Sequence, residues 1–349
     1  MKPMQKIVSC MLIIVLTAGT VSAQTDTMLV ERVSTNEKEI TKLKKIVSKL
    51  PRISGFINFR YQYSDKNGGS NSFDVRRARL DFKGNISTKV DYRLFLEFSG
   101  TPKVLDAYVR WKIDRRVNVQ VGEFKIPFSL ENTYGPTTLE TIDNSMAISK
   151  LCNYSDLSGM SANGRDIGIG LYGGFLPRDG YNIVDYAIGV FNGNGINISD
   201  NNKAKDFSGR LNINPLRSLT LSASYYYGRY KKSGATYSID RERVAAGAQW
   251  VDNKWLVRSE YLYGKTADTK SEGVYAVVGY YVHPQVQPLL KYDYFKSDKA
   301  LDSSRESDFT VGLNYSPIKW IRLQANYTYK LISGSDNVNY LALQLFAIF

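Results

Sequence analysis

Apolar and polar residues alternate with a period of two along most of the chain after residue 51. In the last ten residues, Leu341, Leu343 and Leu345 fall on one side of an extended strand, and Ala342 and Gln344 fall on the other. This alternation is typical of a strand with one apolar and one polar face. Because an open apolar edge strand invites aggregation, a final strand of this kind favours a closed sheet that gives it a partner on both sides.

About sixteen such segments follow one another beyond Pro51, with no helical pattern between them. They cover approximately residues 52–63, 73–83, 90–99, 104–113, 116–125, 165–174, 182–192, 205–213, 217–229, 240–251, 254–264, 273–282, 286–296, 307–316, 318–330 and 338–349. Short connections such as 114–115 and 252–253 alternate with long polar ones, namely 64–72, 193–204, 230–239, 265–272 and 297–306. The pattern predicts an all-β transmembrane antiparallel barrel of about sixteen strands, which is wide enough for an aqueous lumen.

The N-terminal residues have the pattern of a secretory signal. Lys2 and Lys6 precede an apolar run over 7–16, and the small residues 21–23 offer a cleavage site, so residues 1–23 are predicted to be a cleaved signal peptide. No later segment approaches the roughly 18 consecutive apolar residues of a spanning helix. A mature chain that lies in a membrane would therefore cross it as a barrel, over residues 52–349.

Residues 24–51 form a separate helical segment in this prediction. The heptad positions are Val33, Ile40 and Val47 at a, and Leu29, Asn36, Leu43 and Leu50 at d. Pro51 ends the helix. Three heptads are marginal for an isolated coiled coil, so a single amphipathic helix on a surface is one interpretation. The other is a short periplasmic coiled coil that holds protomers together.

The connection between the fifth and sixth strands, residues 126–164, is far longer than the others. A 39-residue connection in a compact array is usually functional. Its centre, 141–151, is compatible with a short helix. In a barrel such a loop can fold inward and narrow the pore; the alternative is a surface lid or a disordered loop.

The chain has a formal charge of +13, which becomes +11 if Lys2 and Lys6 leave with the signal peptide. This excess suits an anionic solute, anionic lipid or nucleic acid as partner, and export makes nucleic acid the least expected. Of the two cysteines, Cys10 lies in the signal region and Cys152 remains. No internal disulfide is therefore expected in the mature chain.

If the apolar face of each strand meets lipid, the opposite face lines the lumen. In the fourth strand, for example, Leu105 and Val109 are predicted to face lipid, so that Asp106 and Arg110 face water. The same phase assignment gives the predicted pore-lining and anion-selecting residues: Lys125, Arg60, Arg77, Arg79, Arg93, Arg110, Lys112, Arg210, Arg243, Arg258, Lys291 and Arg322. Several acidic residues share these phases and could form ion pairs on the wall instead, namely Asp81, Glu97, Asp106, Glu260 and Asp293.

Four segments resemble a known family. They are FDVRRARLDFKG at 73–84, VGEFKIPFSLE at 121–131, GRDIG at 164–168 and YAIGVFNG at 186–193. Their order and spacing resemble the phosphate-selective porin O and P family over most of 52–349. The resemblance implies a trimeric sixteen-stranded outer-membrane porin whose third external loop enters the pore, where basic side chains select anions. It does not identify the solute.

Lys125 is the best single candidate for the constriction, because it opens the long loop within the matched segment 121–131. Guanidinium and ammonium groups are the expected means of attracting anions in a pore. Three acidic residues of the same loop, Glu131, Glu140 and Asp143, could equally oppose an anion.

The chain offers little for catalysis or cofactors. The glycines at 168–173 spell G-x-G-x-x-G, but they fall within a predicted strand, so a nucleotide site is not expected. The one histidine, His283, precedes Pro284 in a short turn. Without a second histidine or cysteine in the mature chain, neither a zinc cluster nor a Cys-His pair is available. We predict no enzyme, metal or cofactor.

The sequence therefore predicts a passive outer-membrane porin of a Gram-negative bacterium that selects small anions, phosphate-like or other. Expected partners are anionic solutes, outer-membrane lipids and further copies in a homotrimer. One alternative is a barrel that serves as an adhesin or scaffold through its external loops. Another is an outer-membrane hydrolase, in which His283 would have to be catalytic.

Overall fold

The computed structural model describes residues 27–47, 50–66 and 68–349. The chain divides into two units, 1–50 and 51–349. In the first, helix α2 (Thr27–Val47) leaves Val33, Ile40 and Leu43 about half exposed, at 54%, 49% and 58%. Association of α2 with other copies stays a prediction, and the predicted signal peptide lies outside the described residues. No helix in the described part of the chain is long and apolar enough to cross a membrane.

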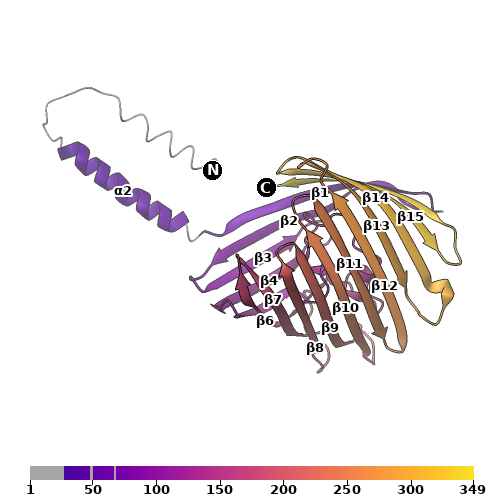
Figure 1. Ribbon diagram of the computed structural model, residues 1–349. Coiled ribbons are helices and arrows are strands. Elements are labelled where there is room, and N and C mark those ends of the chain that lie inside the picture. Colours follow the sequence, from indigo (N-terminus) through magenta and orange to yellow (C-terminus); the bar gives the residue numbers. More distant parts are fainter. Residues whose placement is uncertain (1–26, 48–49, 67) are drawn as a thin grey trace. The chain divides into compact units, whose positions relative to one another are not determined.

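Within the described residues, the second unit contains sixteen antiparallel strands in one closed barrel (Figure 1). The strands are β1 (Arg52–Ser64), β2 (Asn71–Asn85), β3 (Val90–Glu97), β4 (Lys103–Asp114), β5 (Val117–Lys125), β6 (Arg165–Arg178), β7 (Tyr181–Phe191), β8 (Asp206–Leu216), β9 (Leu219–Tyr230), β10 (Ile239–Val251), β11 (Trp255–Thr266), β12 (Thr269–Tyr280), β13 (Val286–Lys296), β14 (Arg305–Ile318), β15 (Ile321–Ile332) and β16 (Val338–Ile348). Short helices η1 (Glu131–Thr133), α3 (Met146–Leu151) and η2 (Asp302–Ser304) lie in the connections. The predicted sixteen-stranded barrel is confirmed.

The first and last strands close the barrel. β1 pairs antiparallel with β16, with Arg60 opposite Gln344. Beyond the strand end, Gly55 N donates to Phe349 O (2.8 Å) and Phe349 N donates to Gly55 O (2.9 Å). The C-terminal strand therefore has a partner on each side, as its apolar alternation predicted.

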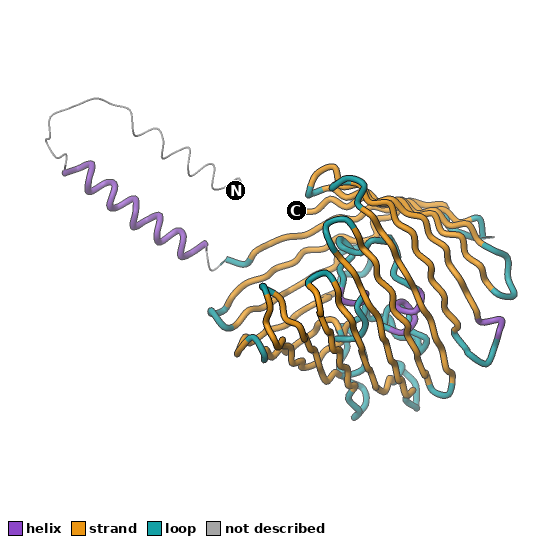
Figure 2. Tube along the Cα trace, in the orientation of Figure 1, coloured by secondary structure: helices purple, strands orange, loops and turns teal. Residues whose placement is uncertain are grey.

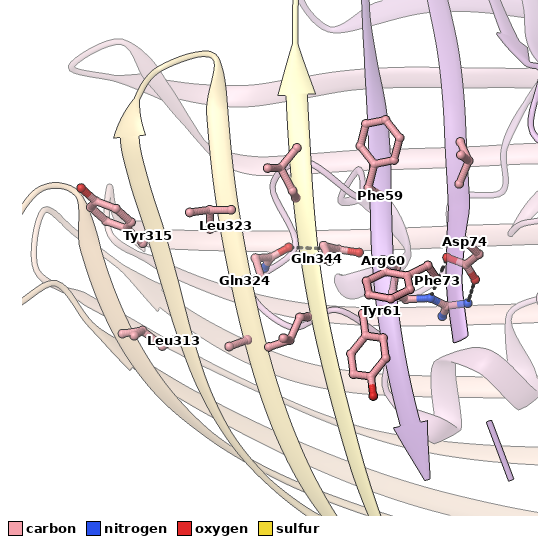
Figure 3. A pocket seen from close by; sticks show the side chains of 14 residues that line it. Phe59, Arg60, Tyr61, Phe73, Asp74, Leu313, Tyr315, Leu323, Gln324 and Gln344 are labelled. Atoms are coloured by element: carbon pink, nitrogen blue, oxygen red, sulfur yellow. Dashed lines mark hydrogen bonds and ion pairs between the residues drawn. The ribbon is translucent and has the colours of Figure 1, made fainter. Parts of the chain in front are cut away.

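Alternate residues of each strand face opposite sides of the wall. Around the barrel closure, Phe59 and Leu343 are exposed on the outer face. The inward residues make polar contacts instead: Arg60 donates to Asp74, and Gln344 Nε2 donates to Gln324 Oε1 at 2.6 Å (Figure 3). The outer wall is thus apolar and the inner wall is largely polar, as a barrel in lipid requires.

Two bulges change the inward set. Between β1 and β2 the register skips Arg76, so Arg76 and Arg77 both turn inward, whereas Val75 is exposed outside. Between β3 and β4 it skips Leu105. The prediction that Leu105 faces lipid is wrong, because this extra residue places Leu105 on the inside beside Asp106, fully buried in an apolar cluster with Met160 of the long loop.

The expected long loop at 265–272 is also wrong. β11 continues to Thr266 and β12 begins at Thr269, so Ala267 and Asp268 form a two-residue hairpin turn. Ala267 has a positive φ of 51°, as tight hairpin turns require. The polar residues here extend the strands beyond the apolar band instead of forming a loop.

We expect Gly55→Ala to destabilise the closure of the barrel. A Cβ at this position would lie 2.4 Å from the carbonyl oxygen of Arg79 and 2.8 Å from the ring of Phe349. Overpacking against backbone typically costs about 1–3 kcal/mol. Heat-dependent mobility in gel electrophoresis should show unfolding at a lower temperature.

Gly209→Ala is the matched control for this substitution. Its Cβ would have its nearest neighbour, Ile188 Cγ2, at an ordinary 3.4 Å. Equal unfolding temperatures for the two variants would contradict the steric argument.

Candidate functional site

The segment 126–164 lies inside the ring of strands and binds inward-facing residues of the wall on several sides (Figure 2). Arg210 of β8 donates to Ser129 O (2.9 Å) and Arg322 of β15 donates to Thr137 O (2.5 Å). Asn326, also on β15, accepts from Ile142 N at 2.7 Å. The segment, called the internal loop below, thus extends across the lumen from β5.

The internal loop begins with a strained turn. Ser129 has a φ of 67°, in the left-handed region that a non-glycine residue rarely adopts. The Ser129 N–H donates to Ser224 Oγ (3.2 Å), and the Ser129 hydroxyl donates to Glu260 (2.9 Å). The Ser129 carbonyl accepts from Arg210. Wall residues on three strands therefore hold the conformation that directs the chain inward.

Buried carboxylates bind the backbone of the internal loop. Glu260 accepts from Leu130 N (2.7 Å) and Glu131 N (3.0 Å). Within the loop, Glu131 in turn accepts from the N–H and hydroxyl of Ser145, both at 2.7 Å. These bonds satisfy backbone donors that have been removed from bulk water.

Ion pairs fix the middle of the internal loop. Arg258 contacts Glu140 at 2.5 Å, with side-chain exposures of 1% and 6%. Arg76 of β2 forms an ion pair with Asp143 and also donates to Ile142 O at 2.8 Å. Burial alone would raise the pKa of Asp143, but Arg76 and Arg60 outweigh burial and hold that pKa below its ordinary value. Glu140 and Asp143 are thus bound by arginines and do not stand free to repel an anion.

The twelve predicted basic residues all contact inward-facing or loop groups, but they differ in charge compensation. Eight form ion pairs: Arg60 with Asp74, Arg79 with Glu97, Arg93 with Asp81 and Asp106, Arg110 and Lys112 with Asp91, Arg243 with Asp156, Arg258 with Glu140, and Lys291 with Asp293. Six of the eight pair with carboxylates on the wall, which was the alternative interpretation of these residues, whereas Arg243 and Arg258 pair with carboxylates of the internal loop.

The other four have no carboxylate within ion-pair distance among the described residues. Lys125 Nζ donates to Asn132 O and Tyr134 O, both at 2.6 Å. Arg210 and Arg322 bind the loop carbonyls named above, and Arg77 donates to Asn58 Oδ1 at 3.4 Å. A hydrogen bond to a neutral oxygen brings no opposite charge, so within the described residues these four cations have no carboxylate that offsets their charge.

Two neighbouring cavities separate the internal loop from the wall formed by β1–β6, β8 and β16, and they share Arg93, Lys125 and Thr133. The larger has a volume of about 510 Å³. Seven basic residues line the two cavities: Lys83, Arg93, Arg110, Lys112, Lys125, Arg165 and Arg210. Three carboxylates line them or pair with these residues: Asp81, Asp91 and Asp106. We call this region the basic cavity.

Several inward cations were missing from the sequence prediction. Arg76 was missed because of its bulge, although the outward apolar positions change phase between Val75 and Ala78. Arg165 forms an ion pair with Asp106 (2.8 Å) and stands within the matched segment 164–168. Arg241, fully buried against Asp206 (2.8 Å), has the phase of the predicted Arg243 two positions later. In each case a signal was present in the sequence.

The residues considered for other chemistry lie in structural positions. His283 is in the exposed turn after β12, where its Nδ1 accepts from Gln285 N at 3.3 Å. The glycines at 168–173 are part of β6. Cys152 is a buried free thiol, and burial raises its pKa well above the ordinary value. None of the three forms a recognisable reactive centre.

Comparison with models of protein families shows to which family the chain belongs. Residues 52–339 match the sequence model for phosphate-selective porin O and P, which covers most of the chain. The chain belongs to the phosphate-selective porin O and P family. The resemblance of the four segments is thereby confirmed. Family membership and a porin-like barrel indicate an outer-membrane channel rather than an enzyme.

Solved structures with the same fold are also porins and channels. The outer-membrane channel DcaP of Acinetobacter baumannii aligns with a TM-score of 0.61 and 16% identity, over 86% of this chain and 97% of that chain. OmpF of Salmonella typhi, solved with daunomycin, aligns with a TM-score of 0.66 and 12% identity, over 86% of this chain and 98% of that chain. OmpT of Vibrio cholerae in a trimer form aligns with a TM-score of 0.62 and 12% identity, over 86% of this chain and 99% of that chain. At these identities the likeness concerns the fold alone. Among curated proteins, no sequence matches this porin.

We expect Glu140→Gln to loosen the internal loop of this porin, because it leaves Arg258 buried without a counter-charge. Breaking a buried ion pair by removing one partner costs about 3–5 kcal/mol. Limited proteolysis of the folded barrel should then cut within 126–164 faster than in the wild type.

The matched control is the double variant Glu140→Gln with Arg258→Met. Replacing both partners removes the unpaired charge, so much of the protease resistance should return. A double variant cut faster than the single one would contradict this account of the anchor.

Proposed function

We propose that this porin is a passive diffusion channel that favours small anions, whether phosphate-like or others. The observation behind the proposal is the basic cavity, where seven basic residues face three carboxylates. A net positive, narrow aqueous space with low-dielectric walls concentrates anions and excludes cations. The predicted residue Lys125 lines both cavities and has no carboxylate partner within the described part of the chain.

Conduction also requires that no site hold the ion too tightly. Pairing with Asp91 and Asp81 lowers the charge that Arg110, Lys112 and Arg93 present to a passing anion. Unpaired Lys125 and Arg210 supply the remaining attraction. This mixture favours many weak contacts over one strong phosphate site, and we propose no phosphate affinity.

The selectivity is tested by the reversal potential of the purified protein in a planar bilayer under a KCl gradient. We expect the wild type to favour chloride, and Lys125→Glu to lower the chloride-to-potassium permeability ratio several-fold. A unit charge about 4 Å from the ion's path is worth up to about 4 kcal/mol before screening near a protein surface. Lys112→Glu should act in the same direction without removing the bonds of Lys125 to the internal loop.

Lys319→Glu is the control, since it makes the same change of charge in the exposed turn between β14 and β15. It should leave the ratio nearly unchanged. A cation-selective wild type, or no effect of either lumen variant, would overturn the anion-selective channel. Folded protein that carries no current would favour an adhesin or scaffold.

We further propose that the porin is a homotrimer whose α2 helices form a short periplasmic coiled coil. The half-exposed Val33 and Ile40 are seven residues apart on α2, which is the spacing of a seam that needs a partner helix. OmpT, which has the same barrel fold, exists in a trimer form.

Ile40→Lys should therefore weaken the trimer, as seen by native mass spectrometry of detergent-solubilised protein. A charge buried in a coiled-coil seam loses solvation without gaining a partner. Lys42→Gln, on an exposed polar position of the same helix, should not weaken it. A trimer that survives Ile40→Lys unchanged would show that the barrel alone holds the copies together.

A further inference from the structure

Part of the basic cavity is aromatic. Tyr108 of β4 and Tyr172 of β6 line it, and both flank Phe124 of β5 with ring centroids 6.3 Å and 6.2 Å away. Both contacts are edge-on, with interplanar angles of 86° and 67°. Phe124 is 2% exposed and backs the other two rings, which remain partly exposed. The three rings form a continuous apolar surface, called the aromatic shelf below.

The strand register places basic residues beside the aromatic shelf. Arg110 lies opposite Gln120, and Gln120 lies opposite Gly170. Tyr172 follows Gly170 by two residues on the same side of β6. It lies opposite Asn118, which lies opposite Lys112. Successive inward rows are about 7 Å apart, so cation and ring positions are separated by about the length of a small aromatic anion.

Glycine makes the shelf accessible. A Cβ at Gly170 would lie 2.8 Å from the Tyr172 ring, which shows that this ring lies against the wall across Gly170. The ring therefore presents a face along the wall in the row of Arg110. Gly170 is the second glycine of the G-x-G-x-x-G sequence, which lies within strand β6.

Two cations that line the same cavity as the shelf have exposed side chains. The side chains of Arg110 and Lys112 are each 39% exposed. Arg110 meets Asp91 through Nε and Nη2, so that pair does not use its Nη1. Arg210 binds Ser129 O through Nη1 and completes the basic side of the cavity.

An inorganic anion gains little from three aromatic rings, because it loses hydration at an apolar surface. A carboxylate joined to a planar apolar ring gains twice, since its charge meets the cations while its ring covers the apolar surface. We propose that the aromatic shelf, with Arg110 and Lys112, binds aromatic carboxylates in transit. The proposal rests on the anion channel proposed above and names the class of solute that this channel favours.

The test uses benzoate and acetate as blockers of chloride current through the purified full-length protein in a planar bilayer. We expect benzoate to block at a lower concentration than acetate in the wild type. The measured quantity is the ratio of the acetate concentration to the benzoate concentration that halves the current. Tyr172→Ser should reduce this ratio at least about fivefold, the lower end of the effect of losing an aromatic stacking partner. Tyr172→Phe keeps the ring and should keep the ratio.

Two further variants separate the shelf from general damage. Gly170→Ala retains every ring and charge but displaces the Tyr172 ring, so it should also lower the ratio. It provides the test if Tyr172→Ser fails to fold. Tyr340→Ser removes a lumen tyrosine that lines a different cavity, beside Asp143 and Lys330, and should leave the ratio unchanged.

The outcomes also separate this proposal from the one on which it rests. An anion-selective wild type that benzoate and acetate block equally would overturn the shelf alone, as would a preference unaffected by Tyr172→Ser and Gly170→Ala. A wild type that favours potassium would overturn the anion channel itself. Benzoate preference lost in Tyr172→Ser and kept in Tyr172→Phe would support the shelf.

Discussion

A chain that crosses lipid has to provide a partner for every backbone N–H and C=O group within its own structure, and the other features of this porin follow from that requirement. Pairing of β1 with β16 closes the sheet, so no strand edge meets lipid. Closure gives every strand one lipid face and one water face. Sixteen strands enclose more space than side chains fill, and the internal loop occupies part of that space. Its own backbone then needs partners, which Glu260 and Asn326 provide.

The same wall residues that bind the loop also decide where charge remains. The charge of Arg258 is compensated by Glu140, so Arg258 anchors the loop and adds little positive charge to the lumen. Arg210 anchors the loop as well, but through a carbonyl, and keeps its charge. An inward cation can therefore hold the loop with or without losing its charge to a carboxylate, depending on the acceptor atom that it binds. The identity of the partner, more than the number of inward cations, sets the field that an ion meets.

Much of the fold could be predicted from the sequence, because alternation is a local property that each strand shows by itself. All sixteen strands, and the inward side of residues such as Arg60 and Lys291, follow from it. Leu105 could not be placed this way, since a bulge depends on how a neighbouring strand pairs. Ion pairs between the loop and the wall, such as Arg258 with Glu140, join residues 118 positions apart. No periodicity connects such residues, so the sequence could indicate that the loop enters the lumen but not what holds it there.

Charge alone distinguishes an anion from a cation, but it does little to distinguish one small anion from another. That second discrimination needs contacts that depend on the rest of the solute, and in this lumen the aromatic shelf is where such contacts lie beside the cations. Gly170 matters for the same reason, because any side chain there would lift the Tyr172 ring from the wall. The absence of a side chain at Gly170 thus affects the shape of the cavity, whereas the arginines determine its charge. Its significance depends on the strand that contains it, which is why the same glycine pattern has one meaning at the start of a helix and another on the wall of a barrel.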